Sequence, residues 1–154
     1  MSTRPAAPFF IRMDRLTRHL SQDFLGGPRP VKFASVINLQ KGATAFWVLA
    51  LMWGYQNTSL HAWIYLGLHG SYGLCWLLKD RVFPDPNWEV RITIGGALMA
   101  MLFVLGPYWL FSWVLIAGHA AGASLPWLGF AIALHTLGIA IMMSADAQKY
   151  FRNL

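Results

Sequence analysis

Two histidines lie deep inside apolar segments, and an imidazole in such a place can do chemistry. His69 lies near the middle of residues 58–78, and His135 lies near the middle of residues 124–144. Ionisable side chains inside a membrane segment are candidates for function, because lipid disfavours their charge. Two imidazoles at one depth could bind the iron of a b-type haem. The alternative is a pair of neutral histidines hydrogen-bonded within a tightly packed helix bundle, which the neighbouring glycines favour.

A second group of polar side chains occupies the stretch LLKDRVFPDPNWEVR at residues 77–91. Its three carboxylates, with basic residues beside them, could bind a polar cofactor. The simpler interpretation is a solvated turn between two helices. Pro84 and Pro86 restrict the backbone there, and Trp88 can anchor the turn at a membrane interface. We favour the turn, and we expect Lys79 and Arg81 to meet lipid headgroups.

Beyond these two groups the sequence offers few reactive residues. It contains no glycine-rich phosphate loop, no Cys and His spacing typical of a metal site, and no serine nucleophile motif. The one cysteine, Cys75, lies in an apolar run and is interpreted as a small apolar side chain. We therefore predict no catalytic residue, no metal site and no cofactor, with NADPH, S-adenosylmethionine and haem as less favoured candidates. An enzyme is not favoured.

The composition indicates which elements must position these residues. Of the 154 residues, 56% are hydrophobic and 12% are charged, whereas about a quarter of the residues in a soluble domain are charged. We predict an all-α integral membrane protein with four transmembrane helices, at about residues 43–56, 58–78, 92–118 and 124–144. Lys41 limits the first span at its N-terminal end. Pro107 is expected to kink the third span, because proline lacks an N–H donor.

Lysine and arginine residues are distributed unevenly between the predicted connections. Ahead of the first span lie Arg4, Arg12, Arg15, Arg18, Arg29, Lys32 and Lys41; between the second and third spans lie Lys79, Arg81 and Arg91; after the fourth lie Lys149 and Arg152. The other two connections carry none. By the positive-inside rule, both termini lie on the inner side of the membrane. That membrane would be a bacterial cytoplasmic membrane or an organellar (mitochondrial or plastid) inner membrane.

Residues 1–41 are predicted to form an N-terminal arm ahead of the transmembrane domain at residues 42–154. Within the arm, apolar residues follow helical spacing at about residues 9–24, and basic residues occupy other faces. Such an amphipathic helix lies in the plane of the lipid headgroups, with Arg12, Arg15 and Arg18 near anionic phospholipids. Packing against a partner subunit explains the pattern equally well. Because the chain has apolar spans, its charge of +6 favours lipid over nucleic acid.

Small residues are expected to hold the helices together, because apolar burial gives little drive for helix association in lipid. The second span carries Gly67, Gly70 and Gly73, and the fourth carries Gly129, Ala133 and Ala140. Backbones can approach closely where such residues share one face of a helix. We predict that these faces form the contacts of the bundle, which leaves larger apolar side chains for lipid or a partner protein.

Three strings of the sequence resemble one family of multispan membrane proteins. They are HGSYGLCWLLKDRVFPDPNW at residues 69–88, GPYWLF at residues 106–111 and SADAQKYF at residues 144–151. They are similar to the N-terminal half of the steroid 5-alpha-reductase C-terminal-domain and isoprenylcysteine methyltransferase-like proteins. The resemblance runs from about residue 39 to the end, and it rests mainly on the patterns K-D-x-x-F-P-D and D-x-Q-K.

The resemblance implies a place for the last of these strings. In the family, the D-x-Q-K segment, here Asp146, Gln148 and Lys149, leads out of a membrane helix. It enters a region that forms most of the pocket for NADPH or S-adenosylmethionine. We expect that region to be missing here, so these three residues are motif matches and not a predicted active site.

These observations together predict a non-catalytic accessory subunit of a larger membrane protein complex, derived from a reductase- or methyltransferase-like scaffold. Its partners would be other membrane subunits and anionic phospholipids, not nucleic acid. One alternative is part of a membrane-bound NADPH-dependent reductase or S-adenosylmethionine-dependent methyltransferase. A second alternative is a small b-type cytochrome that uses His69 and His135.

Overall fold

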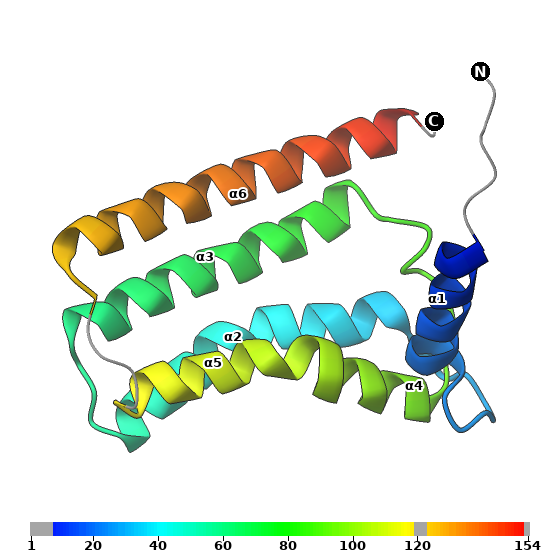
Figure 1. Cartoon of the computed structure of the whole chain (residues 1–154), viewed down its shortest axis with the longest axis horizontal. Helices are drawn as coiled ribbons and strands as arrows, with labels where there is room; N and C mark the ends of the chain where they lie inside the picture. The colour runs from blue at the N-terminus through cyan, green and yellow to red at the C-terminus, as the bar shows by residue number, and fades with distance from the viewer. Residues whose placement is uncertain (1–7, 119–122, 153–154) are drawn as a thin grey trace.

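The computed structural model describes residues 8–118 and 123–152, and these residues form an all-α fold with one short pair of strands (Figure 1). The predicted all-α class is therefore confirmed. In chain order the elements are α1 (Pro8–Arg18), the π-helical turn η1 (His19–Asp23), β1 (Val31–Lys32), α2 (Phe33–Gly54), α3 (Leu60–Val82), β2 (Arg91–Ile92), α4 (Ile94–Met99), the π-helical segment η2 (Ala100–Leu105), α5 (Gly106–Ile116) and α6 (Leu125–Arg152).

The long helices α2, α3, α5 and α6 lie alongside one another (Figure 1). α2 packs against both α3 and α5, and α6 packs mainly against α3 at the edge of the group. The antiparallel strands pair Val31 with Ile92 and Lys32 with Arg91. This short ladder brings the start of α2 beside the start of α4.

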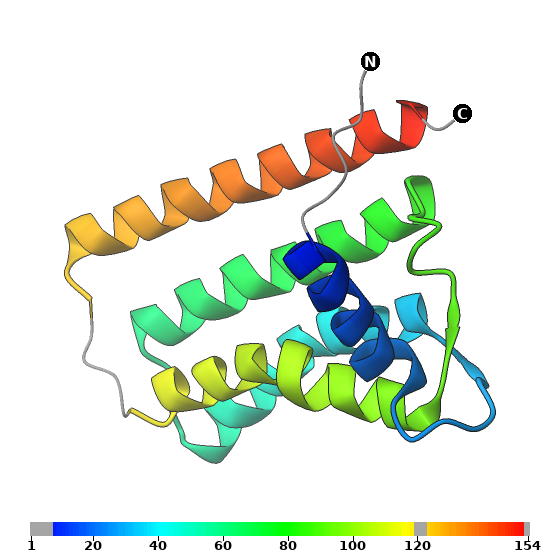
Figure 2. The same cartoon turned by 45° about the vertical axis from the view of Figure 1, so that its right-hand side comes forward.

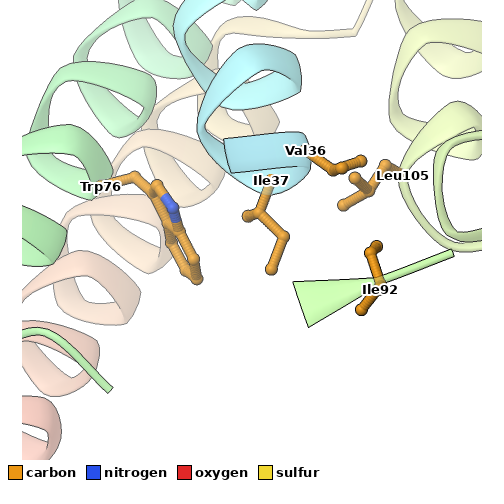
Figure 3. Close-up of a cluster of buried hydrophobic side chains, with 5 residues drawn as sticks. All are labelled: Val36, Ile37, Trp76, Ile92 and Leu105. Atoms are coloured by element: carbon orange, nitrogen blue, oxygen red, sulfur yellow. The ribbon is translucent and has the colours of Figure 1, made fainter. Parts of the chain in front are cut away.

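The buried core lies between α2, α3 and the run from α4 to α5. One cluster consists of Val36, Ile37, Trp76, Ile92 and Leu105 (Figure 3). A second cluster consists of Val48, Leu51, Met52, Ala62 and Ile116. α6 contributes no buried member to either cluster, although Met142 is partly buried against the first. The core therefore holds the other long helices together and leaves α6 at its margin.

α2 begins earlier than predicted. The helix starts at Phe33, whereas the predicted span began at about residue 43 and placed Lys41 outside it. Lys41 lies inside the helix and is 6% exposed. Its ammonium lies over aromatic rings of neighbouring helices, which take the place of water. The helix therefore extends beyond the N-terminal end of the predicted first span, and the bounds of that span stay a prediction.

α1 and η1 together cover residues 8–23, close to the helix predicted at residues 9–24. This element crosses one end of the long helices (Figure 2), and its last turn packs against α4. Thr93 fixes the contact: its backbone N–H donates to the Gln22 carbonyl oxygen, and its hydroxyl donates to the Phe24 carbonyl oxygen, both at 2.9 Å. Gly95 is needed there, because a Cβ would lie 2.3 Å from that same Phe24 oxygen.

The run from α4 through η2 to α5 is continuous, and its middle is π-helical. η2 ends directly before Gly106 and Pro107. Proline has no N–H, and its ring collides with the carbonyl four residues earlier, so a widened turn accommodates it. Gln40 of α2 donates its Nε2 to the Leu105 carbonyl oxygen at 3.3 Å. The interruption expected at Pro107 thus takes the form of a π-helical segment.

Within the described part of the chain, two helical runs are long and apolar enough to cross a membrane: Ile94–Ile116 and Leu125–Arg152. The apolar window of the second is 0% buried within the fold, as expected of a helix that faces lipid or another protein. α2 and α3 are comparable in length but carry more polar side chains, including Lys41 and Lys79. The two apolar runs indicate a membrane protein.

Candidate functional site

Two of the three strings that carry the family resemblance, residues 69–88 and 144–151, meet at one end of the fold. Lys79, in the last turn of α3, places its Nζ 3.2 Å from Asp146 Oδ2 on α6. Lys149, one turn further along α6, pairs with Asp85 in the connection after α3. Each string therefore supplies one lysine and one carboxylate to the other. We call these four residues the clamp, because they tie the end of α6 to α3 and the connection that follows it.

Lys79 is the buried centre of the clamp, with a side chain that is 0% exposed. Its Nζ lies 4.3 Å from the ring centroid of Trp88 and 4.7 Å from that of Trp76. The two indoles stack at 5.0 Å and wall in the ammonium. Lys79 Nζ makes no aligned hydrogen bond among the described residues, so its contact with Asp146 is an ion pair. Burial excludes the lipid headgroup contact predicted for Lys79.

Asp85 is held by more than one donor. The Asn87 backbone N–H lies 3.0 Å from Asp85 Oδ1, the Asn87 side-chain amide lies 3.1 Å from it, and Lys149 donates to the other oxygen. Burial alone would raise the pKa of this carboxyl, but these donors outweigh it, so the pKa of Asp85 lies below its ordinary value. Asp85 is therefore built to remain ionised beside Lys149.

The other two carboxylates of residues 77–91, Asp80 and Glu89, are also paired. Asn38 of α2 donates to Asp80 at 2.7 Å and accepts from the Trp76 indole at 3.1 Å. Lys32 donates to Glu89 at 2.6 Å. The predicted turn is thus an ordered segment whose carboxylates bind neighbouring elements. Arg81 and Gln148 are exposed.

A small cavity opens beside the clamp, with a volume of about 150 Å³. It is lined by Phe83, Pro84, Asp85, Pro86, Asp146, Lys149 and Tyr150. Two of the three motif matches on α6 therefore line it, whereas Gln148 does not. The cavity is too small for a whole nucleotide cofactor, but it lies where the family resemblance implies that a cofactor pocket begins.

The structure brings His69 and His135 together. Their ring centroids lie 5.8 Å apart with planes tilted by 42°. His69 stacks on Tyr65 at 3.8 Å, and its Nδ1 lies 3.2 Å from the Tyr65 carbonyl oxygen. The Nε2 of His135 is buried and makes no hydrogen bond among the described residues.

Both histidines line two cavities, which have volumes of about 570 Å³ and 260 Å³. Their presence removes the objection that glycines would pack the histidines too tightly for a ligand. The stacked Tyr65 covers one face of His69, and the hydrogen bond of that residue to the Tyr65 carbonyl uses Nδ1 rather than Nε2. Haem ligation by His69 and His135 stays the less favoured alternative, which an absorption spectrum would test.

The small residues of the predicted contact faces divide into two groups. At Gly73 an added Cβ would lie 2.4 Å from the Lys41 carbonyl oxygen, and at Gly70 it would lie 3.5 Å from the Ala45 Cβ, so both lie at the contact of α2 with α3. Gly67 and Gly129 have no described neighbour within 4 Å of such a Cβ. Ala133 and Ala140 are exposed. The small residues of α6, Gly129, Ala133 and Ala140, therefore do not make the predicted close helix contact within the described part of this chain.

The predicted headgroup-binding arginines lie on α1. Arg12, Arg15 and Arg18 are exposed, and Arg18 pairs with Asp14 at 2.9 Å. Phe9 and Leu16 are exposed as well, at 64% and 51%. The element is amphipathic and is not covered by the rest of the fold, so its contact with lipid stays a prediction.

Sequence reasoning missed the surroundings of Lys41. Its Nζ lies 3.9 Å from the ring centroid of Tyr108, 4.9 Å from that of Tyr72 and 5.7 Å from that of Trp76. The spacing of Tyr72 and Trp76 places both rings on one face of α3, which was the available signal. Tyr108 comes from a distant part of the chain, and no local pattern could have indicated it.

Comparison with protein-family models, curated proteins and solved structures found no match for this chain. The resemblance to reductase- and methyltransferase-like proteins therefore stays a prediction that rests on the quoted strings. The geometry adds that these strings contact each other through Lys79 with Asp146 and through Asp85 with Lys149.

Proposed function

We propose that the chain is an integral membrane protein with four spans, formed by α2, α3, the run from α4 to α5, and α6. Figure 1 supports this proposal, because these helices lie alongside one another. Lys32 precedes α2, Lys79 and Arg81 lie in the last turn of α3, and Lys149 and Arg152 lie in the last turn of α6. These helix ends share one end of the fold, so the positive-inside rule places them on the inner side.

Within that membrane, the chain acts as a non-catalytic structural subunit that binds another membrane protein along α6. The exposure of α6 carries this proposal: none of the described residues of this 28-residue helix is buried. Its exposed face includes Gly129, Ala133 and Ala140. Small residues allow another helix to approach closely, whereas lipid gains nothing from them.

The clamp explains how α6 can serve as a docking helix although the core does not hold it. Lys79 with Asp146 and Lys149 with Asp85 fix its last two turns. The two lysines and two carboxylates of the clamp thereby neutralise one another. In this reading, they orient a helix for a partner and do not contact a substrate.

The test is purification of the full chain from its native membrane in mild detergent, followed by native mass measurement. We expect a stoichiometric complex with a second membrane protein. Ala133→Leu and Ala140→Leu should release that protein, because leucine would block close approach of a helix. Leu134→Ile and Ile141→Leu, of equal size on another face of α6, serve as controls and should retain it. A wild-type chain that purifies without a partner would refute the proposal.

A second candidate function is a reductase or methyltransferase module, which the cavity beside the clamp favours. The cavity is lined by Asp85, Asp146 and Lys149 at the end of α6. Further protein, from the same or another chain, could complete a pocket for NADPH or S-adenosylmethionine there. Titration of the purified chain and of its native complex with each cofactor tests this candidate. Saturable binding that Lys149→Met abolishes would support it over the structural subunit.

A further inference from the structure

Lys41 is buried in the fold, and its ammonium has no anionic partner among the described residues. The residue is 6% exposed, and its Nζ lies over the faces of Tyr72, Trp76 and Tyr108. None of the ion pairs found among residues 8–118 and 123–152 includes Lys41. Aromatic faces attract a cation, but they leave its positive charge uncompensated. This residue therefore lacks the counter-ion that a buried ammonium normally has.

Lys41 lines a cavity of about 330 Å³ between α2, α3 and the η2–α5 run. Most of the other side chains that line the cavity are apolar or aromatic, among them Ile37, Trp88 and Val104. A ligand that fits such walls is apolar along most of its length and carries a negative charge at one end.

Two of the rings that lie over the ammonium belong to tyrosines, Tyr72 and Tyr108. Both residues line the cavity, and their hydroxyl groups make no hydrogen bond among the described residues. A hydroxyl can donate to an anion, and hydrogen bonds to charged groups are stronger than those between neutral groups. Lys41 with these two hydroxyls thus offers one positive charge and two donors at the wall of an apolar cavity.

We propose that this cavity binds the carboxylate of a long-chain fatty acid or a similar single-chain amphiphile, with the carboxylate on Lys41 and the chain along the apolar wall. One ammonium matches the single charge of a carboxylate, whereas a phosphate monoester carries about −1.5 to −2 charges and would require a second cation. The proposal does not depend on a partner protein at α6.

The experiment uses the full chain in phosphatidylcholine nanodiscs and measures quenching of tryptophan fluorescence by dibromostearic acid. Trp76 and Trp88 line the cavity, so a bromine atom bound there quenches them. We expect saturable quenching. Dibromostearic acid methyl ester, which lacks the charge, should bind at least ~10-fold more weakly, as expected for loss of a charge-assisted contact.

Variants locate the site. Lys41→Met should weaken binding of the acid at least ~10-fold, and Lys41→Arg should retain most of it. Lys32→Met, which removes an exposed lysine at the start of the same helix, is the matched control and should bind as the wild type does.

Equal binding by Lys41→Met would overturn the proposal. If that variant does not fold, equal affinity of the wild type for acid and methyl ester overturns it instead. Displacement by millimolar inorganic phosphate would also overturn it, because the site would then take a free anion.

Discussion

Lys79 and Lys41 are two buried lysines on neighbouring helices, and they differ in what neutralises them. Trp76 lies close to both, since its ring centroid is 4.7 Å from the Nζ of Lys79 and 5.7 Å from the Nζ of Lys41. Lys79 also has Asp146 at 3.2 Å. The nearest group to the Lys41 ammonium among its ring contacts is the aromatic ring of Tyr108, whereas the Lys79 ammonium has a carboxylate beside it.

This difference separates a structural contact from an open site. Removing an ammonium from water costs several kcal/mol, of which an aromatic ring returns about 0.5–2 kcal/mol. For Lys79, the ion pair with Asp146 offsets the rest of this desolvation cost. The charge of Lys79 is thus compensated within the chain, and the ion pair joins α3 to α6. Lys41 has no such compensation in the described residues, so its charge is available to a ligand.

Asp146→Asn should have the largest effect, because it gives Lys79 the uncompensated surroundings that Lys41 has. Removal of one partner from a buried ion pair costs about 3–5 kcal/mol. We expect a loss near 3 kcal/mol, the lower limit, because Asp146 is 25% exposed and water can partly replace it. Denaturant unfolding in detergent, followed by circular dichroism, measures the change.

The double variant Lys79→Met with Asp146→Asn is the control for that measurement. It removes the buried charge together with its partner, and we expect it to recover most of the lost stability. If Asp146→Asn unfolds at the same denaturant concentration as the wild type, the ion pair does not hold α6.

Gly73→Ala should have the next largest effect, because it separates the two helices that carry the lysines. The new Cβ would lie 2.4 Å from the Lys41 backbone carbonyl oxygen, and a backbone atom cannot move aside as a side chain can. Overpacking of this kind costs about 1–3 kcal/mol. Gly67→Ala is the matched control, since its Cβ would have no described neighbour within 4 Å. Equal losses for the two variants would show that the close approach of α2 and α3 is not the cause.

Breaking the second ion pair of the clamp, Asp85 with Lys149, should lower stability by a smaller amount that depends on pH. Asp85 has a pKa below its ordinary value, so its contribution to stability is complete above the pKa of the unfolded chain, about 4. That contribution disappears as the pH falls through the lower pKa of the folded state. Lys149→Met removes the lysine that lowers this pKa.

The corresponding measurement compares the free energy of unfolding of wild type and Lys149→Met at several pH values between 7 and 3. At pH 7 the variant should be less stable by about 1 kcal/mol, since Lys149 is 46% exposed and water screens the pair. The difference should shrink toward the acid end. A constant difference across the range would assign the effect to lost packing.

The sequence predicted the helices better than their contacts. The helical spacing at residues 9–24 and the apolar runs that became α3 and α6 are local patterns, and each can be seen within one element. The sequence did not indicate the burial of Lys41, because the rings that cover it come from α3 and α5, which no window around residue 41 contains. A charged residue is a sign that a span has ended only where no side chains from other helices cover its charge.

The clamp shows the same limit for the candidate site. Lys79 and Asp146 stand in different strings, and their pairing depends on how α6 lies against α3. The sequence indicated each string through a resemblance, but it gave no sign that Lys79 pairs with Asp146 or that Lys149 pairs with Asp85. The small residues of α6 show the limit in another way. Their periodicity identified one face of the helix, but it could not show what covers that face.

Lys41→Met should change stability least, and this result would sharpen the comparison between the lysines. The substitution keeps the length and apolar stem of the side chain and removes a charge that has no described ionic partner. No carboxylate is left unpaired, so we expect the free energy of unfolding to stay within about 1 kcal/mol of wild type or to rise. The same denaturant titration in detergent free of fatty acid measures it. A loss as large as that of Asp146→Asn would mean that the rings around Lys41 already compensate its charge, and the cavity would then need no anionic ligand.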